Sequence, residues 1–329
     1  MTMKTNRKTQ FDIIRILAIL MIFNYHFCME SGAAESIFCV YKNGGWGSVG
    51  TSIFFLLSGY LIHMGSKNTN IKTYIKKRFL SIYPALWLSF IIVYLLTSIK
   101  RNNYLWGGEV WRIILSFLGV DTYLQYYYIP TYSCVGEWFT AMIIFLYITY
   151  LLLRILIKKC PNISTIVITI LYFAECIIGI QKNVPADASI FTALMLFWIG
   201  MLLQEYPTML QTKMWKVVLA VIISVAVMFI KLPFIGNVLP WKNLLGIAIF
   251  YLLHVIFSAI KFGETSTRIL KFFSSLSFAF YLIHHFVMIQ IIERYGTNII
   301  AFTYLMALII TLVTASAITN ITNKLRYNS

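Results

Sequence analysis

The sequence predicts an all-α polytopic membrane protein with about ten transmembrane helices and both termini in the cytoplasm. Of the 329 residues, 60% are hydrophobic and only 12% are charged, which lies outside the range of soluble domains. Ten stretches are also apolar over close to the 20 or so residues that a membrane-spanning helix needs. We therefore expect a single membrane domain over residues 1–329, without an additional soluble domain.

The distribution of basic residues predicts the orientation. The ten expected spans cover about 11–28, 47–65, 79–99, 138–157, 163–181, 189–204, 215–232, 243–260, 273–293 and 299–320. Eighteen lysines and arginines fall in the termini and connections assigned to the inside, and eight fall in those assigned to the outside. Cytoplasmic loops carry such an excess. We therefore expect a multi-pass protein of the cell (plasma) membrane.

The first span, FDIIRILAILMIFNYHF, contains Arg15 and His26. Eleven residues at about 100° and 1.5 Å per residue place both side chains on one helix face, about 16 Å apart. Asp12 shares this face and can neutralise Arg15. Ionisable groups at membrane depth are costly, so they indicate a functional site by default. The basic start resembles a signal peptide but lacks a small-residue cleavage site, so we expect the segment to be retained.

The second span, GWGSVGTSIFFLLSGYLIHMG, is interrupted by small residues. Ser58 and Gly59 break its apolar run at mid-membrane depth, and Gly47 and Gly50 precede them. Small residues let helix backbones approach closely. This span is therefore predicted to pack tightly against a neighbouring helix.

The third span begins at a basic cluster formed by Lys76, Lys77 and Arg78. Such a cluster usually anchors topology, but it also stands where the phosphates of an anionic cytosolic substrate would be held.

The connection over 100–137 follows the third span. Its segment WRIILSFLGV predicts a short interfacial helix. Its Tyr-rich segment TYLQYYYIPTYS either stacks on sugars or peptides or anchors the membrane interface.

Glu137 stands at the outer end of the fourth span, at a depth similar to that of His26. A carboxylate and an imidazole at one depth suit a general acid/base pair. Glu175 is a second membrane acid, but no residue at helical spacing pairs with it.

All five histidines fall within the expected spans, although any single one is also explained by a hydrogen bond to a neighbouring helix. They are His26, His63, His254, His284 and His285.

Two other classes of function find no support. The net charge is +16, but the basic residues flank apolar runs and do not form a separate module, so no nucleic-acid partner is expected. The five cysteines show neither C-x-x-C nor Cys/His ligand spacing, so no metal and no redox motif is expected. A disulfide between Cys39 and Cys134 is possible, but free thiols are the simpler expectation.

Several motifs together resemble the membrane-bound acyltransferase 3 family, of the type that O-acetylates surface glycans. They include Arg-x10-His at Arg15 and His26, VGTSIFFLLSGYLI in the second span, and the basic stretch before Tyr83–Pro84. They continue with GEWF at 136–139, FWIGMLL at 197–203, and SFAFYLIHH, in which Tyr281 and His284 match a Tyr-Leu-x-His pattern. The motifs occur in order over nearly the whole chain. Members of this family move short acyl groups from cytosolic acyl-CoA to acceptors at the outer face.

The resemblance implies roles for individual residues. His26 would act as a general base or as a nucleophile that forms an acyl-imidazole. Glu137 would orient His26, and Arg15 would organise the donor. The implied donor-binding residues are Arg15, Asp12, Lys76, Lys77, Arg78, Ser58 and Tyr83, and further candidates are His284, Tyr281 and Trp138.

Two differences from the family pattern affect these expectations. Ser81 stands where many members have a second arginine before the Tyr–Pro dipeptide, so phosphate binding is left to Arg78 and its lysine neighbours. Some members carry an extracytoplasmic hydrolase-like domain, and we expect none in this chain. Transfer is therefore expected within the membrane domain or with a partner.

We expect an O-acyltransferase that moves an acetyl group from acetyl-CoA to a hydroxyl of a cell-surface or exported polysaccharide or a lipid-linked glycan. Acyl-CoA is expected as a substrate and not as a tightly bound cofactor, and membrane lipid surrounds the protein. The alternative is an exporter of polysaccharides or small molecules without acyl chemistry. A glycan polymerase or ligase would have a large Arg-rich outer loop, and 100–137 contains only Arg101 and Arg112.

Overall fold

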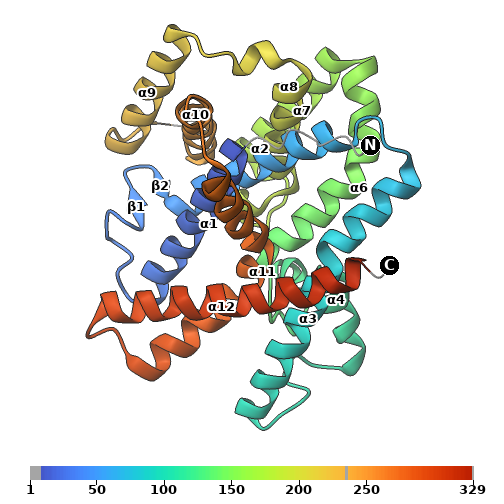
Figure 1. Ribbon diagram of the computed structural model, residues 1–329, viewed down its shortest axis with the longest axis vertical. Coiled ribbons are helices and arrows are strands. Elements are labelled where there is room, and N and C mark those ends of the chain that lie inside the picture. The colour runs from blue at the N-terminus through green and yellow to red at the C-terminus, as the bar shows by residue number, and fades with distance from the viewer. Residues whose placement is uncertain (1–8, 234–235, 328–329) are drawn as a thin grey trace.

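The described chain is built almost entirely from helices (Figure 1). A computed structural model describes residues 9–233 and 236–327. The basic N-terminal residues Lys4, Arg7 and Lys8, which entered the orientation argument, lie outside the described residues.

The first half of the chain contains six helices and a two-stranded antiparallel sheet, β1 (Val40–Tyr41) and β2 (Gly44–Gly45). Its helices are α1 (Thr9–Glu30), α2 (Trp46–Ser66), α3 (Ile71–Arg101), α4 (Ile113–Leu118), α5 (Asp121–Leu124) and α6 (Glu137–Lys159). The second half contains α7 (Pro161–Ile178), α8 (Ile190–Glu205), α9 (Met214–Phe229), α10 (Leu239–Ser258), α11 (Glu264–Tyr295) and α12 (Ile300–Tyr327). Single turns of 3₁₀ helix cover Val110–Arg112, Gln125–Tyr127, Ala186–Ala188 and Pro207–Leu210.

A helix covers each of the ten apolar stretches. Eight of these helices, among the described residues, are long and apolar enough to cross a membrane. The other two, α8 and α9, are apolar but have only 16 residues each. The predicted class, an all-α polytopic membrane protein, is confirmed.

Several helix ends differ from the predicted spans. Helix α3 begins at Ile71, well before 79, because the Asn70 side chain accepts a hydrogen bond from the Thr73 amide at 2.8 Å and caps the helix. Helix α7 ends at Ile178 because Gly179 adopts a left-handed conformation. Helix α9 ends at Phe229 because Ile230 is extended. Hydropathy locates the apolar run, but the residues at the helix ends set where each helix begins and ends.

Glycines bring α2 close to its neighbours, as its small residues predicted. A Cβ atom on Gly59 would lie 2.0 Å from the Phe197 carbonyl oxygen of α8, and one on Gly200 would lie 2.0 Å from the Leu56 carbonyl oxygen of α2. On the opposite side, a Cβ on Gly50 would lie 2.7 Å from the Ala18 carbonyl oxygen of α1. Helix α2 is therefore fixed between α1 and α8. Figure 1 shows α1 and α2 near the middle of the molecule, with α9 on the left and α6 on the right.

Contacts between distant segments fix the directions of the helices that carry the site. The early parts of α1, α3 and α11 and the late part of α12 line one common cavity. The late part of α1 instead meets the start of α6 and the later part of α11. Helices α1, α3 and α11 therefore run in one direction, and α6 and α12 run in the other. This alternation is the one that the predicted order of spans requires.

The connection after α3 contains the predicted short helix, α4, preceded by a 3₁₀ turn. Its Tyr-rich part is tied to the α7–α8 connection by Gln181, whose amide nitrogen donates to the Tyr123 hydroxyl at 2.8 Å. All five cysteines are free, so no disulfide joins Cys39 and Cys134.

Candidate functional site

Glu137, the first residue of α6, lies between histidines from two other helices. Its Oε2 is 3.5 Å from Nε2 of His26 in α1. Its Oε1 is 2.8 Å from Nδ1 of His285 in α11. The second distance is that of a hydrogen bond, and the first is slightly longer than one. His26 and Glu137, which were predicted to lie at a similar depth, thus have side chains that lie next to each other.

The backbone before Glu137 is held in an uncommon conformation. Gly136 has a φ of 79° and Glu137 a φ of 35°, a region in which a non-glycine residue costs about 1–3 kcal/mol. The Gly136 carbonyl accepts hydrogen bonds from the hydroxyls of Tyr281 at 2.9 Å and Thr140 at 2.6 Å. These bonds from α11 and α6 fix the point from which the Glu137 side chain extends.

His284 supplies a third imidazole to this cluster. It is fully buried, and its ring centroid lies 5.3 Å from that of His26. Its Nδ1 is 2.7 Å from the Tyr281 carbonyl oxygen, which can only accept, so Nδ1 carries the proton. The other ring nitrogen, Nε2, has no hydrogen-bond partner among the described residues.

One nitrogen or oxygen atom from each of His26, Glu137 and His284 lies within 4.8 Å of the other two. The ligand atoms of these three residues are therefore close enough together to hold a metal ion. The sequence contains no spacing that signals such a group, because the three residues come from three different helices.

Glu30, the last residue of α1, completes the cluster. Its Oε1 lies 2.9 Å from Nε2 of His285. Neither Glu30 nor His285 was among the predicted site residues. A signal for Glu30 was present, because it follows His26 by four residues and so lies on the same helix face. His285 was harder to find, because it points about 100° away from the adjacent His284 around the helix.

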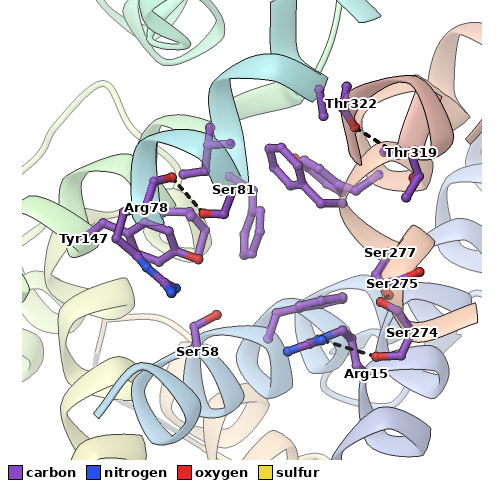
Figure 2. A pocket seen from close by; sticks show the side chains of 18 of the residues that line it. Arg15, Ser58, Arg78, Ser81, Tyr147, Ser274, Ser275, Ser277, Thr319 and Thr322 are labelled. Carbon is purple, nitrogen blue, oxygen red and sulfur yellow. Dashed lines mark hydrogen bonds between the residues drawn. The ribbon is translucent and has the colours of Figure 1, made fainter. Parts of the chain in front are cut away.

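A second group of polar residues lines a cavity of about 330 Å³ toward the other end of α1 (Figure 2). Figure 2 shows the guanidinium groups of Arg15 and Arg78 facing the same space. Nη1 of Arg15 donates to the Ser274 hydroxyl at 3.2 Å. Arg78 lies over the rings of Tyr74 and Tyr147, and its Nε has no hydrogen-bond partner within the described part of the chain.

The donor-binding residues predicted on α3 do not all reach this cavity. Arg78 lines it, whereas Lys76 and Lys77 are exposed on the same helix. Ser81, which was not predicted to bind the donor, lines the cavity beside Arg78. The reason is helical geometry, because residues three apart share a face and adjacent residues do not. The hydroxyl of Ser81, in the place of a second arginine, donates to the Arg78 carbonyl at 2.7 Å.

The remaining predicted residues divide between the two groups. Ser58 lines the cavity of about 330 Å³ together with Arg15. We call this cavity the inner cavity, because the predicted orientation places it toward the cytoplasm. Asp12 is buried but does not belong to the cavity wall, and Tyr83 instead stacks on Phe79 with ring centroids 4.7 Å apart. Trp138 lines a small cavity beside His26.

Two cavities adjoin the Glu137 cluster. The larger, of about 650 Å³, has Glu137 and His285 in its wall. The smaller, of about 150 Å³, has His26 and Glu137 in its wall. Tyr281 lines both, and it also lines the inner cavity that contains Arg15. The cavity of the arginine group and the cavity beside His26 therefore share Phe139 and Tyr281 as wall residues, and Tyr281 lines all three cavities.

Comparisons with known proteins extend these observations. The sequence model of a family described as an acyltransferase domain matches residues 8–320. Acyltransferase MdmB of Streptomyces mycarofaciens is 28% identical over 123 residues, which cover 35% of this chain and 30% of that protein. The match thus spans less than a third of the relative's length. No solved structure matches the chain.

Proposed function

This chain belongs to the acyltransferase family whose model spans residues 8–320, and from that premise we propose that it transfers an acetyl group from cytosolic acetyl-CoA to a hydroxyl of a cell-surface or exported polysaccharide. The observation that carries the proposal is the pairing of an arginine-lined cavity with a carboxylate–imidazole cluster across the shared wall at Tyr281. Family membership also favours acyl transfer over export without acyl chemistry.

The inner cavity suits the acyl-CoA donor. Guanidinium groups bind phosphate through charge-assisted hydrogen bonds, and Nε of Arg78 is a donor without a partner among the described residues. The exposed Lys76 and Lys77 lie outside the cavity on the same helix, where they would attract the nucleotide phosphates. Under the predicted orientation, this end of the bundle faces the cytoplasm.

The larger outer cavity suits a hydroxyl-rich acceptor. Its volume of about 650 Å³ lies within the range of small-ligand sites. Its wall includes the polar side chains of Thr122, Ser133 and Gln290 and the aromatic ring of Trp106. Hydrogen-bonding groups beside an aromatic face match the surface of a sugar better than that of an acyl chain.

In the proposed reaction, the acceptor hydroxyl reaches His26 past Glu137, which lines both outer cavities. The His26 imidazole removes its proton while the hydroxyl oxygen attacks the thioester carbonyl carbon. The carbon–sulfur bond then breaks, and the CoA thiolate takes the proton from His26. A proton on Nε2 of His26 would face Oε2 of Glu137, so the carboxylate favours Nδ1 as the basic nitrogen and stabilises the imidazolium that forms.

The test is transfer of radiolabel from acetyl-CoA to the surface glycan in membranes that contain the parental protein or His26→Ala. We expect the variant to insert normally and to incorporate no label above background. Incorporation at the parental rate would refute the role of His26. Incubation without acceptor separates two mechanisms, because a base leaves the protein unlabelled whereas a nucleophile retains the acyl group.

The acceptor is tested by NMR of surface glycans from cells with and without the gene. We expect an acetyl signal that the gene restores, and its position identifies the sugar and the hydroxyl together. A purified protein that binds no acyl-CoA would instead point to the exporter.

A further inference from the structure

Four side chains from three helices form a row across the outer end of the bundle. Glu30 contacts His285 at 2.9 Å, His285 contacts Glu137 at 2.8 Å, and Glu137 faces His26 at 3.5 Å. Glu30 and His26 belong to α1, Glu137 to α6 and His285 to α11. The proposed chemistry uses only His26 and Glu137, so the other two residues need a separate explanation.

The contacts of His285 determine its protonation. Each of its ring nitrogens lies within hydrogen-bond distance of a carboxylate oxygen. An ionised carboxylate only accepts hydrogen bonds, so both nitrogens donate and the ring is an imidazolium. The row thus alternates in charge from Glu30 through His285 to Glu137.

Lys100 and Arg101 also line the larger cavity, but each binds another partner. Lys100 of α3 bonds to Glu293 and Gln290 of α11. Arg101 lies over the Trp106 ring, with its guanidinium carbon 4.7 Å from the ring centroid. Without His285, these two cations would be the alternative partners for the Glu137 carboxylate, and turning toward them would take Oε2 away from His26.

We propose that His285, held between Glu30 and Glu137 by a contact at each ring nitrogen, is a positioning residue that fixes Oε1 of Glu137 so that Oε2 faces His26. This inference rests on the proposed function, since the benefit of the arrangement is a correctly oriented His26. Positioning acts on the chemical step, whereas the donor is held in the inner cavity. Loss of His285 therefore lowers kcat and leaves the KM for acetyl-CoA almost unchanged.

The kinetic test uses His285→Gln, Glu30→Gln and the double variant in purified protein. Glu35→Gln is the matched control, because Glu35 is an exposed residue of the following loop. We expect His285→Gln to lower kcat by roughly ten- to a hundredfold, Glu30→Gln to lower it less, and the double variant to match His285→Gln. His285→Lys, which keeps a cation, should recover part of the rate. Unchanged kcat in His285→Gln, or effects of the two substitutions that multiply, would overturn the proposal.

The protonation of His285 is tested without any activity measurement. Solid-state ¹⁵N NMR of histidine-labelled protein in lipid bilayers should show one ring with both nitrogens protonated at neutral pH, and this signal should be lost in His285→Gln. A neutral ring would overturn the inference even if the enzyme is active. If the parental protein transfers no acyl group, the proposed function fails, and the NMR result alone decides whether Glu30 and Glu137 hold an imidazolium.

Discussion

At the scale of single residues, the site depends on the orientation of one carboxylate. Glu137 is the first residue of a helix and follows a glycine with a positive φ. One of its carboxylate oxygens forms a hydrogen bond with His285. Its other oxygen is left for His26. A general base in a protein works best when a neighbouring group fixes its ring and stabilises its charged form.

Replacing Glu137 by Gln should therefore lower kcat by roughly a hundredfold or more, because an amide cannot stabilise the His26 imidazolium. Glu175→Gln is the matched control, since Glu175 is also buried in a membrane helix but accepts a hydrogen bond from the backbone amide of Gln181 at 3.1 Å, away from the histidines. Acetyl transfer by the two variants, normalised to the amount of folded protein, provides the measurement. Equal rates would contradict the assigned role of Glu137.

Replacing Arg78 by Ala should raise the KM for acetyl-CoA by roughly ten- to a hundredfold, the effect of losing a hydrogen bond from a charged group. Arg78→Lys should recover only part of the affinity, because an ammonium cannot make the bidentate contact of a guanidinium. Arg268→Ala, at a side chain with 81% exposure on α11, serves as the control. The assignment fails if Arg78→Ala alters kcat alone.

At the scale of helices, close backbone contact fixes the scaffold of the site. Helix α2 lies between α1, which carries Arg15 and His26, and α8. In a membrane, helix packing depends on such close contacts because lipid provides little hydrophobic driving force for helix association. The reciprocal contact of Gly59 and Gly200 is therefore expected to be sensitive to a single methyl group.

Gly59→Ala and Gly200→Ala should each lower the thermal stability of the detergent-solubilised protein by several degrees, since the new Cβ would meet a backbone carbonyl at 2.0 Å. Overpacking of this kind typically costs about 1–3 kcal/mol. Gly65→Ala, in the same helix, adds a Cβ with nothing within 4 Å. It should leave stability unchanged or raise it slightly, because alanine favours the helix. If Gly59→Ala is as stable as Gly65→Ala, the packing argument is wrong.

The positions of the helices could be predicted from the sequence because apolar runs of the right length must be helical in lipid. The full lengths of α3 and α11 could not be predicted in this way. These helices have 31 and 32 residues, and they extend beyond the apolar runs through charged turns. The approach of His26 to Glu137 was suggested by depth alone. His285 and Glu30 were missed because their role arises from contacts among α1, α6 and α11, which depend on the fold and not on spacing within one helix.

At the scale of the whole molecule, the two groups of polar residues lie toward opposite ends of α1. Arg15 belongs to the inner cavity and His26 to the outer cluster. Eleven residues of helix separate them by about 16 Å, roughly half the thickness of the hydrocarbon core. In the proposed function, this separation would let an acyl group that enters from one side meet an acceptor from the other side without either substrate crossing the membrane.

This arrangement predicts which loops face which side of the membrane. In a variant with all five free cysteines replaced by serine, a single cysteine introduced as Glu35→Cys should react with an impermeant maleimide in intact cells. A cysteine introduced as Glu264→Cys, at the start of α11 near the Arg15 end, should react only after the membrane is permeabilised. Both positions are exposed in the fold, so a difference in labelling reports sidedness and not burial. The reverse pattern would place the arginine-lined cavity outside, away from cytosolic acyl-CoA, and would refute the direction of transfer while leaving the fold and the His26–Glu137 contact intact.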